Sequence, residues 1–337
     1  MKKYLLPNKG NFYKANLHMH TTISDGNMSI EEVKKAYMEQ GYSIVAFTDH
    51  EIMVPHPELT DDKFLAITST EVSVNIRYDC DFRYNKVYHL NLYSKEPLRD
   101  YFKAFTKERM WLKHSFQYIS ENQEKVGFKK EYNVDNINQV IEIANKENML
   151  VSYNHPVWSL QNYIDYIGLK GLWGVEWYNT GCVREGYIDT MQPIDDLLRN
   201  GERVFPLATD DAHALHSCFG GFVMVKASSL DYDEVFNALK KGDFYSSTKP
   251  LIYELYIEDN LIHIKTSEAK KIYLTTDRRY TRFSNSDKMI TEATFDINEY
   301  ISSCNSELSN NHYIRITVVD ASGNEAHTRA YYLDELI

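Results

Sequence analysis

Seven short runs of apolar residues recur along the chain before residue 214, and no other feature restricts its fold as much. They are rich in β-branched and aromatic residues, and several are too uniformly apolar for one face to be exposed to water. The runs cover Tyr13–His20, Ser43–His50, Phe64–Val74, Lys86–Ser94, Asn148–Pro156, Leu172–Asn179 and Glu202–His213. The pattern predicts seven strands in a sheet that is buried on both faces.

Helical patterns separate most of these runs. Residues 29–41 begin with a capping box formed by Ser29 and Glu32, and Asp135 can cap the helix that precedes the fifth run. Further helical patterns cover residues 159–171, 187–201 and 231–244, and residues 96–126 indicate one or two helices inserted after the fourth strand. Strands that alternate with helices predict an α/β fold with a mostly parallel sheet, and seven or eight such units predict a barrel.

Two segments depart from this alternation. The link between the third and fourth strands, residues 75–85, looks like an extended hairpin rather than a crossover helix. After about Lys249, short alternating strands with a turn signal at Asp259-Asn260 predict a small β-sandwich. We place the boundary at Pro250, which gives a barrel of residues 1–249 and a β domain of residues 250–337.

The composition limits the kinds of partner that the chain is expected to bind. The net charge of −11 argues against a nucleic-acid-binding surface, which is normally basic, although it does not exclude a small anionic substrate held by metal ions. No stretch approaches the roughly 18 apolar residues of a membrane span, and Pro7 interrupts the short apolar run near the start. We expect a cytoplasmic protein that does not contact a membrane and does not act on nucleic acid.

Metal-binding side chains lie at or near the ends of these runs, where a parallel barrel places its active site. His18 and His20 are two residues apart, so on a strand they face the same side, and Asp25 can fold back from the next loop. Asp211 and His213 repeat this spacing, which favours Asp211 over Asp210 as a ligand. The predicted ligands are His18, His20, Asp25, His50, Glu71, His89, His155, Asp211 and His213.

Each of these residues also has a structural interpretation. Glu71 can be a carboxylate on an edge strand, His89 a buried core histidine and His155 a loop residue, and Asp49 can cap a helix. Glu176 is interpreted as a structural carboxylate, or one that orients a ligand, rather than as a ligand. The convergence of six histidines on predicted strand ends favours a metal site over separate structural roles.

The size of the set predicts the number and kind of ions. A single catalytic zinc takes three protein ligands and water, so nine ligands suit two or three divalent ions. Imidazole and carboxylate ligands admit zinc, manganese or iron. The four cysteines are scattered without a CxxC pair, so no thiolate favours zinc.

The segments LHMHTTISDG, AFTDHE, TSTEVS, YHLNLY, YNHPVW and TDDAH, between Asn16 and Thr248, resemble the motifs of the PHP (polymerase and histidinol phosphatase) family of metal-dependent phosphoesterases. The resemblance implies a distorted seven-stranded TIM-like β/α barrel, with the nine residues as metal ligands and Glu71 as a bridge between two ions. The segments NHPVWS and VEWYN and the β tail also resemble a branch that includes a carbamate-ester hydrolase.

Together these features predict a metal-dependent hydrolase, a phosphoesterase that attacks a small phosphorylated substrate with water activated by the ions. A third ion is expected near Asp25, His50 and His213. Asp49 and Asp210 are expected to orient ligand imidazoles, and Arg184 is a candidate phosphate clamp. The alternative is a carboxyl- or carbamate-ester hydrolase with the same metal centre.

Overall fold

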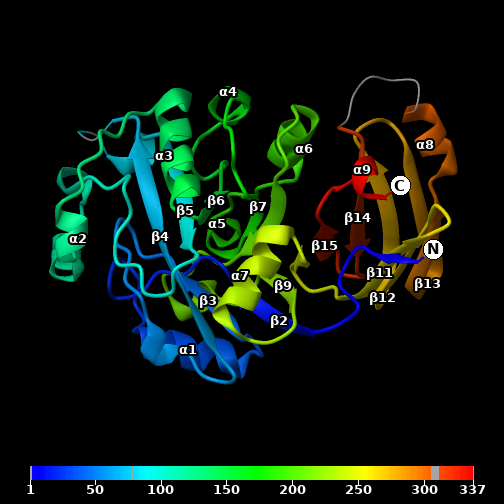
Figure 1. Cartoon of the computed structure of the whole chain (residues 1–337), viewed down its shortest axis with the longest axis horizontal. Coiled ribbons are helices and arrows are strands. Elements are labelled where there is room, and N and C mark those ends of the chain that lie inside the picture. Colours follow the sequence, from blue (N-terminus) through cyan, green and yellow to red (C-terminus); the bar gives the residue numbers. More distant parts are fainter. Residues whose placement is uncertain (1, 78, 80, 305–310, 337) are drawn as a thin grey trace.

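The structure is a computed structural model of the 337-residue chain, and it describes residues 2–336 except 78, 80 and 305–310 (Figure 1). The strands before the β tail are β1 (Lys3–Tyr4), β2 (Asn11–Asn16), β3 (Ile44–Phe47), β4 (Leu65–Asn75), β5 (Val87–Ser94), β6 (Met149–Tyr153), β7 (Gly174–Asn179), β8 (Phe205–Thr209), β9 (Phe222–Ala227) and β10 (Phe244–Ser247). The α-helices are α1 (Ile30–Glu39), α2 (Glu121–Glu124), α3 (Val134–Lys146), α4 (Tyr163–Tyr166), α5 (Thr180–Arg184), α6 (Gln192–Arg199), α7 (Tyr232–Lys241), α8 (Asn298–Cys304) and α9 (Leu333–Leu336). The seven predicted strands correspond to β2–β8, which confirms the mixed α/β class.

The strand pairing of β2–β8 is mixed. The pairs β2–β3, β3–β4, β6–β7 and β7–β8 are parallel, whereas β5 is antiparallel to both β4 and β6. The antiparallel β4–β5 pair confirms the hairpin expected around residues 75–85, in which residue 78 and Cys80 lie outside the described residues.

The described strands β2–β8 do not pair into a closed seven-stranded barrel. The path of hydrogen-bonded strands ends at β8, and β2 pairs along most of its length with the antiparallel strand β9, which occupies the edge that β8 needs for closure. An isolated parallel bridge between Met19 and Ala212 joins the segments that follow β2 and β8. The ends of the first and last predicted strands therefore meet at the site described below.

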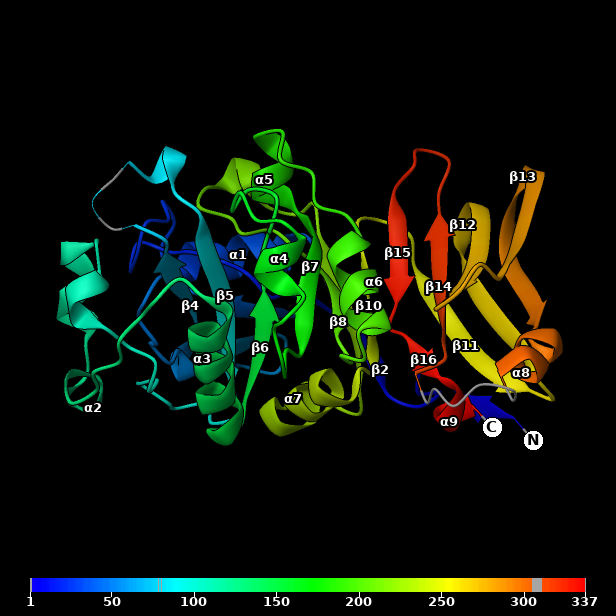
Figure 2. The ribbon, with the colours of Figure 1, turned by 90° about the horizontal axis from the view of Figure 1, so that it is seen from above.

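Helices and strands bury several apolar clusters. The largest contains Ile137, Val140 and Ile141 of α3 against Val151 and Tyr153 of β6. Figure 2 shows α3 beside β6, and α7 near the lower ends of β6 and β8. Helix α1 has the predicted capping box: the Ser29 hydroxyl accepts from the Glu32 amide, and the Glu32 carboxylate accepts from the Ser29 amide.

Two predicted helical segments are mostly irregular and one predicted cap was wrong. Residues 159–171 contain only the four-residue α4. Residues 96–126 form only the 3₁₀ turns Lys107–Arg109 and Lys113–Tyr118 and the four-residue α2. The reason is tertiary: the Gln123 amide exchanges two hydrogen bonds with the Phe102 backbone, of 2.9 and 3.1 Å, which holds an irregular path in place of a helix. Asn133, not Asp135, caps α3, because its side chain accepts from the Asn136 amide.

The β tail continues the same sheet. Its strands are β11 (Ile252–Glu258), β12 (Leu261–Thr276), β13 (Thr281–Asp296), β14 (Tyr313–Val319), β15 (Glu325–Thr328) and β16 (Tyr331–Tyr332). Strand β15 pairs with β10, and β1 at the start of the chain pairs with β11, so both ends of the chain lie in this part (Figure 2). The tail is all-β apart from α8 and α9, but pairing does not separate it as an independent sandwich, and the boundary at Pro250 stays a prediction.

None of the helices in the described part of the chain combines the length and the apolar character needed to cross a membrane.

Candidate metal centre

The first histidines are positioned by a join between the segments after β2 and β8. The Asp211 amide donates to the His18 carbonyl at 2.9 Å, and the His20 amide donates to the Ala212 carbonyl at 3.1 Å. These two bonds flank the Met19–Ala212 bridge. They bring the His18 and His20 imidazoles to within 3.2 Å of each other, measured between their Nε2 atoms, and place Asp211 beside them.

Asp25 reaches the histidines because its loop folds tightly back on itself. A Cβ at Gly26 would lie 2.4 Å from the His20 carbonyl oxygen, so only glycine allows this close approach. The Asp49 carboxylate holds the loop from below, accepting from the backbone amides and hydroxyls of Thr21 and Ser24 at 2.7–3.1 Å. The sequence SDG thus builds the turn that carries the carboxylate.

Glu71 of β4 lies at the centre of the cluster, almost completely buried. Its Oε1 lies 3.2–3.4 Å from nitrogens of three imidazoles, those of His18, His89 and His155. Its Oε2 lies 3.2–3.3 Å from nitrogens of two others, those of His20 and His50. The two oxygens therefore face different sets of histidines, as a carboxylate shared by two ions must.

All nine residues predicted as ligands lie in three overlapping groups. The groups are His18, His20, Glu71 and Asp211; Glu71, His89 and His155; and His20, Asp25, His50 and His213. Ligand atoms within each group lie within 4.8 Å of one another. Glu71 and His20 each belong to two groups, so the arrangement suits neighbouring ions that share ligands.

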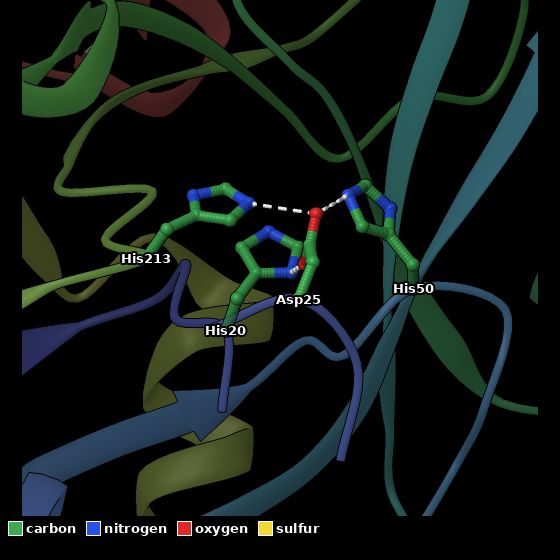
Figure 3. A group of neighbouring side chains, drawn as sticks. All are labelled: His20, Asp25, His50 and His213. Atoms are coloured by element: carbon green, nitrogen blue, oxygen red, sulfur yellow. Dashed lines mark ion pairs between the residues drawn. The ribbon is translucent and has the colours of Figure 1, made fainter. Parts of the chain in front are cut away.

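The third group forms the open face of the centre (Figure 3). Oδ2 of Asp25 lies 3.3 Å from the His213 imidazole and 3.6 Å from that of His50. The side chains of Asp25 and His213 are 22% and 38% exposed, whereas His18 and His20 are fully buried. Burial lowers the pKa of His50 to about 3, while His50 and its neighbours hold the pKa of Asp25 well below its ordinary value against the effect of burial.

Four buried ligand atoms fit a bound cation. Nδ1 of His20 and of His50, Oε2 of Glu71 and Oδ1 of Asp211 have no hydrogen-bond partner among the described residues. Buried polar atoms in folded proteins are almost always partnered, and these four belong to residues of the overlapping ligand groups. Divalent ions would satisfy them, because neutral imidazoles and carboxylates are the ligands of zinc, manganese and iron.

The electrostatics of the cluster also favour positive charge. Burial lowers the pKa of an imidazole, but the carboxylates of Asp211 and Glu71 outweigh it, raising the pKa of His18 well above its ordinary value, that of His20 to about 10 and that of His155 to about 9. The imidazoles in turn hold the pKa of Glu71 and of Asp211 well below their ordinary values, although burial opposes this.

Two of the nine residues have a strained backbone. His155 has φ +27° and Asp211 has φ +49°, in a region that side chains with a Cβ rarely adopt. Such strain persists only where surrounding contacts impose it, and it is common at functional sites.

The PHP domain model matches residues 16–224, which is more than half of the chain, and the match spans all nine of these residues. The chain belongs to the PHP domain family. This confirms the predicted family and, at the level of the family, the predicted class of enzyme, a metal-dependent phosphoesterase.

Individual relatives of this PHP domain are distant or short. A 37-residue segment is 51% identical to DNA polymerase/3′-5′ exonuclease PolX of Bacillus subtilis (strain 168), covering 11% of this chain and 6% of the polymerase. A two-domain protein from Bacteroides vulgatus that contains a predicted PHP-like metal-dependent phosphoesterase is 12% identical over 98% of both chains, with a TM-score of 0.44. The lesion-specific endonuclease PfuEndoQ from Pyrococcus furiosus is 16% identical over 68% of this chain and 56% of its own, with a TM-score of 0.40.

The imidazole of His18 is oriented by the carboxylate of Glu176 on β7, not by that of Asp49 or Asp210. Oε1 of Glu176 lies 2.8 Å from Nδ1 of His18 and leaves Nε2 facing the other ligands. Asp210 instead accepts from the Tyr37 hydroxyl and from backbone amides of residues 219–221, which organises the loop before β9. Asp49 likewise accepts hydrogen bonds from the loop that carries Asp25. The expectation that Asp49 and Asp210 orient ligand imidazoles is therefore corrected.

Two asparagines of the site were missed by the sequence reasoning. Nδ2 of Asn154 donates to Oε1 of Glu71 at 2.8 Å, and Nδ2 of Asn179 donates to Oδ2 of Asp211 at 3.1 Å. Asn154 directly follows β6 and Asn179 ends β7, so a search of strand ends that included amides would have found both. Arg184 is exposed at the end of α5, and its role as a phosphate clamp stays a proposal.

Proposed function

We propose that this PHP domain hydrolyses a small phosphorylated substrate in a metal-dependent reaction with water. The observation that carries the proposal is the position of Glu71, whose two oxygens face five imidazoles from four different segments. A structural carboxylate has no use for five imidazoles, whereas two divalent ions that share a carboxylate need further ligands to complete their coordination.

Different groups of residues would hold different ions. The two groups that share Glu71 would each hold an ion, and His20, Asp25, His50 and His213 would hold a third at the open face. Bound divalent ions would supply Lewis acidity and would lower the pKa of water towards neutrality. Glu176 keeps the His18 ring in one orientation, and Arg184 is proposed to bind phosphate oxygens with its guanidinium.

The experiment compares one preparation in three states: as purified, after chelation, and after restoration of zinc, manganese or iron. The substrates are p-nitrophenyl phosphate, bis-p-nitrophenyl phosphate, p-nitrophenyl acetate, an aryl carbamate and a single-stranded oligonucleotide. We expect two to three ions per chain and hydrolysis of a phosphate ester that chelation abolishes and metal restores.

Other outcomes overturn parts of the proposal. Hydrolysis of the acetate or carbamate without that of any phosphate ester would replace the phosphoesterase by the alternative ester hydrolase. Cleavage of the oligonucleotide alone would exclude a small substrate. Phosphoester hydrolysis that survives the removal of all bound metal would refute the metal-dependent reaction.

A further inference from the structure

We propose that Trp111 and Trp158 are substrate-contacting walls on either side of the metal centre, and that they select phosphate esters carrying a flat ring over alkyl phosphates. The inference rests on the proposed phosphoesterase function and adds a substrate class to it. It is carried by the exposure of Trp111 and by the placement of both indoles beside histidines of the centre.

Trp111 is a large apolar side chain that is mostly exposed to solvent. Its side chain is 58% exposed, although a large indole is normally buried in a folded chain. The ring lies 5.9 Å from the His50 ring, between centroids, at an interplanar angle of 58°. His50 belongs to the open face of the centre, so this exposed indole stands at its entrance.

The backbone on both sides of Trp111 is anchored, so its exposure does not reflect a loose loop. Met110 is buried in the core, and the hydroxyl of the buried Ser115 donates to the Ile23 carbonyl at 2.6 Å. His114 contacts the Ser24 carbonyl, also at 2.6 Å, one residue before the predicted ligand Asp25. The segment is thus fixed to the loop that completes the centre.

The segment that directly follows the insertion is also anchored. Lys130 forms a buried ion pair with Glu51, the residue after His50, at 2.5 Å. Glu51 also accepts from the Ser73 amide at 2.7 Å, on the strand that carries Glu71. A buried charge pair of this kind is costly to break, so the insertion keeps a fixed position relative to the ligands.

Trp158 lies beside two other histidines of the centre. Its ring lies 5.7 Å from that of His89 and 5.2 Å from that of His155, and its Nε1 donates to the Glu185 carboxylate at 3.1 Å. The His50 and His89 rings are 5.3 Å apart. Trp111, His50, His89 and Trp158 therefore form a row of neighbouring rings with an indole at each end.

This arrangement fits a substrate whose phosphate lies at the ligands while its ring packs against an indole. Indoles attract flat rings by stacking and by removing apolar surface from water, whereas an alkyl group gains less from the same wall. Aryl and nucleobase groups share this chemistry.

The test measures KM for phenyl phosphate and for ethyl phosphate in Trp111→Ala, Trp111→Phe and the wild type, with metal content determined on each sample. The matched control is Phe283→Ala, because Phe283 is a similarly exposed aromatic residue, 61% exposed, on β13. Binding of phenylphosphonate and methylphosphonate, measured by calorimetry, gives a readout that needs no turnover.

We expect Trp111→Ala to reduce the preference for phenyl over ethyl phosphate, and for phenyl- over methylphosphonate, by about tenfold. Trp111→Phe should restore most of the preference, and Phe283→Ala should not change it. Equal losses for both substrates, or a preference unaffected by Trp111→Ala, would overturn the inference. A wild type that hydrolyses no phosphate ester at all would refute the proposed function instead, while the phosphonates would still test the walls. Mononucleotides compared with phenyl phosphate then distinguish a nucleobase from a simple aryl group.

Discussion

At the scale of single residues, Glu71 is the carboxylate on which the centre depends. We expect Glu71→Gln to lose at least one ion and most of the activity, because an amide has one good acceptor oxygen and no charge. Two cations roughly 3.5–4 Å apart repel each other, and the negative charge of a shared carboxylate offsets this repulsion. The fold should survive, since the side chain keeps its shape.

Elemental analysis and phosphoester turnover on the same samples measure this effect. Glu292→Gln is the matched control, because it makes the same chemical change at an exposed position of β13. Full metal content and wild-type turnover in Glu71→Gln would show that Glu71 does not bridge ions.

The raised pKa values of the imidazoles predict proton release on metal binding. Without metal, His20 has a pKa of about 10 and His155 of about 9, so both carry a proton at pH 8, where an ordinary imidazole has already lost it. Metal requires the neutral ring, so binding at pH 8 must release protons, and the release should fade as the pH rises past these values. Calorimetry of zinc binding in two buffers of different ionisation enthalpy measures it, and a heat independent of the buffer at pH 8 would contradict the raised values.

At the scale of elements, the loop that carries Asp25 depends on Gly26. We expect Gly26→Ala to displace the loop, because its Cβ would lie 2.4 Å from the His20 carbonyl oxygen. The ion at the open face should be lost, while the two groups around Glu71 keep theirs. Metal content and melting temperature measure this, with Gly127→Ala as control, because a Cβ at Gly127 would meet nothing within 4 Å. An unchanged metal content in Gly26→Ala would mean that the loop adapts without moving Asp25.

The strands and their terminal ligands were predictable because both signals are local. Apolar runs mark the buried strands, and the spacing of two residues in His18 and His20 or in Asp211 and His213 is visible in the sequence. The insertion after β5 was not predictable in the same way. Its helical composition is overridden by contacts with distant residues, such as the bond from Ser115 to Ile23, which no local pattern encodes.

At the scale of the whole molecule, the two parts expected from the sequence share one sheet and buried polar contacts. Strand β10 pairs with β15 across about 80 positions of the chain, a separation that sequence patterns cannot reveal. Nη2 of Arg315 on β14 donates to both carboxylate oxygens of Asp195 on α6, at 2.8 and 3.0 Å. The indole of Trp177 on β7 packs against His327 of β15, with ring centroids 4.4 Å apart.

These contacts predict that residues 1–249 do not form an independent unit. Truncation at Lys249 would remove β15, one of the two strands that pair with β10, and leave Trp177 without His327. It would also expose Leu5 and Leu6, which pack in the apolar cluster of the β tail. An unpaired strand edge beside exposed apolar surface favours aggregation. We therefore expect the truncated chain to be insoluble, or to melt well below the full chain, although it keeps all nine predicted ligands.

Circular dichroism melting of both chains, with metal content measured on the soluble fraction, tests this expectation. In the full chain, the signal of the strands and the fluorescence of the buried Trp177 should change in one transition, because the sheet runs through both parts. Arg315→Met is the point-variant counterpart: it leaves the partly buried Asp195 without its cation, which should lower the free energy of unfolding by about 2 kcal/mol and shift both signals together. A soluble truncated chain with full metal content and an unchanged melting temperature would instead establish residues 1–249 as a separate domain, and the shared strand pairing would then contribute little to the stability of the metal centre.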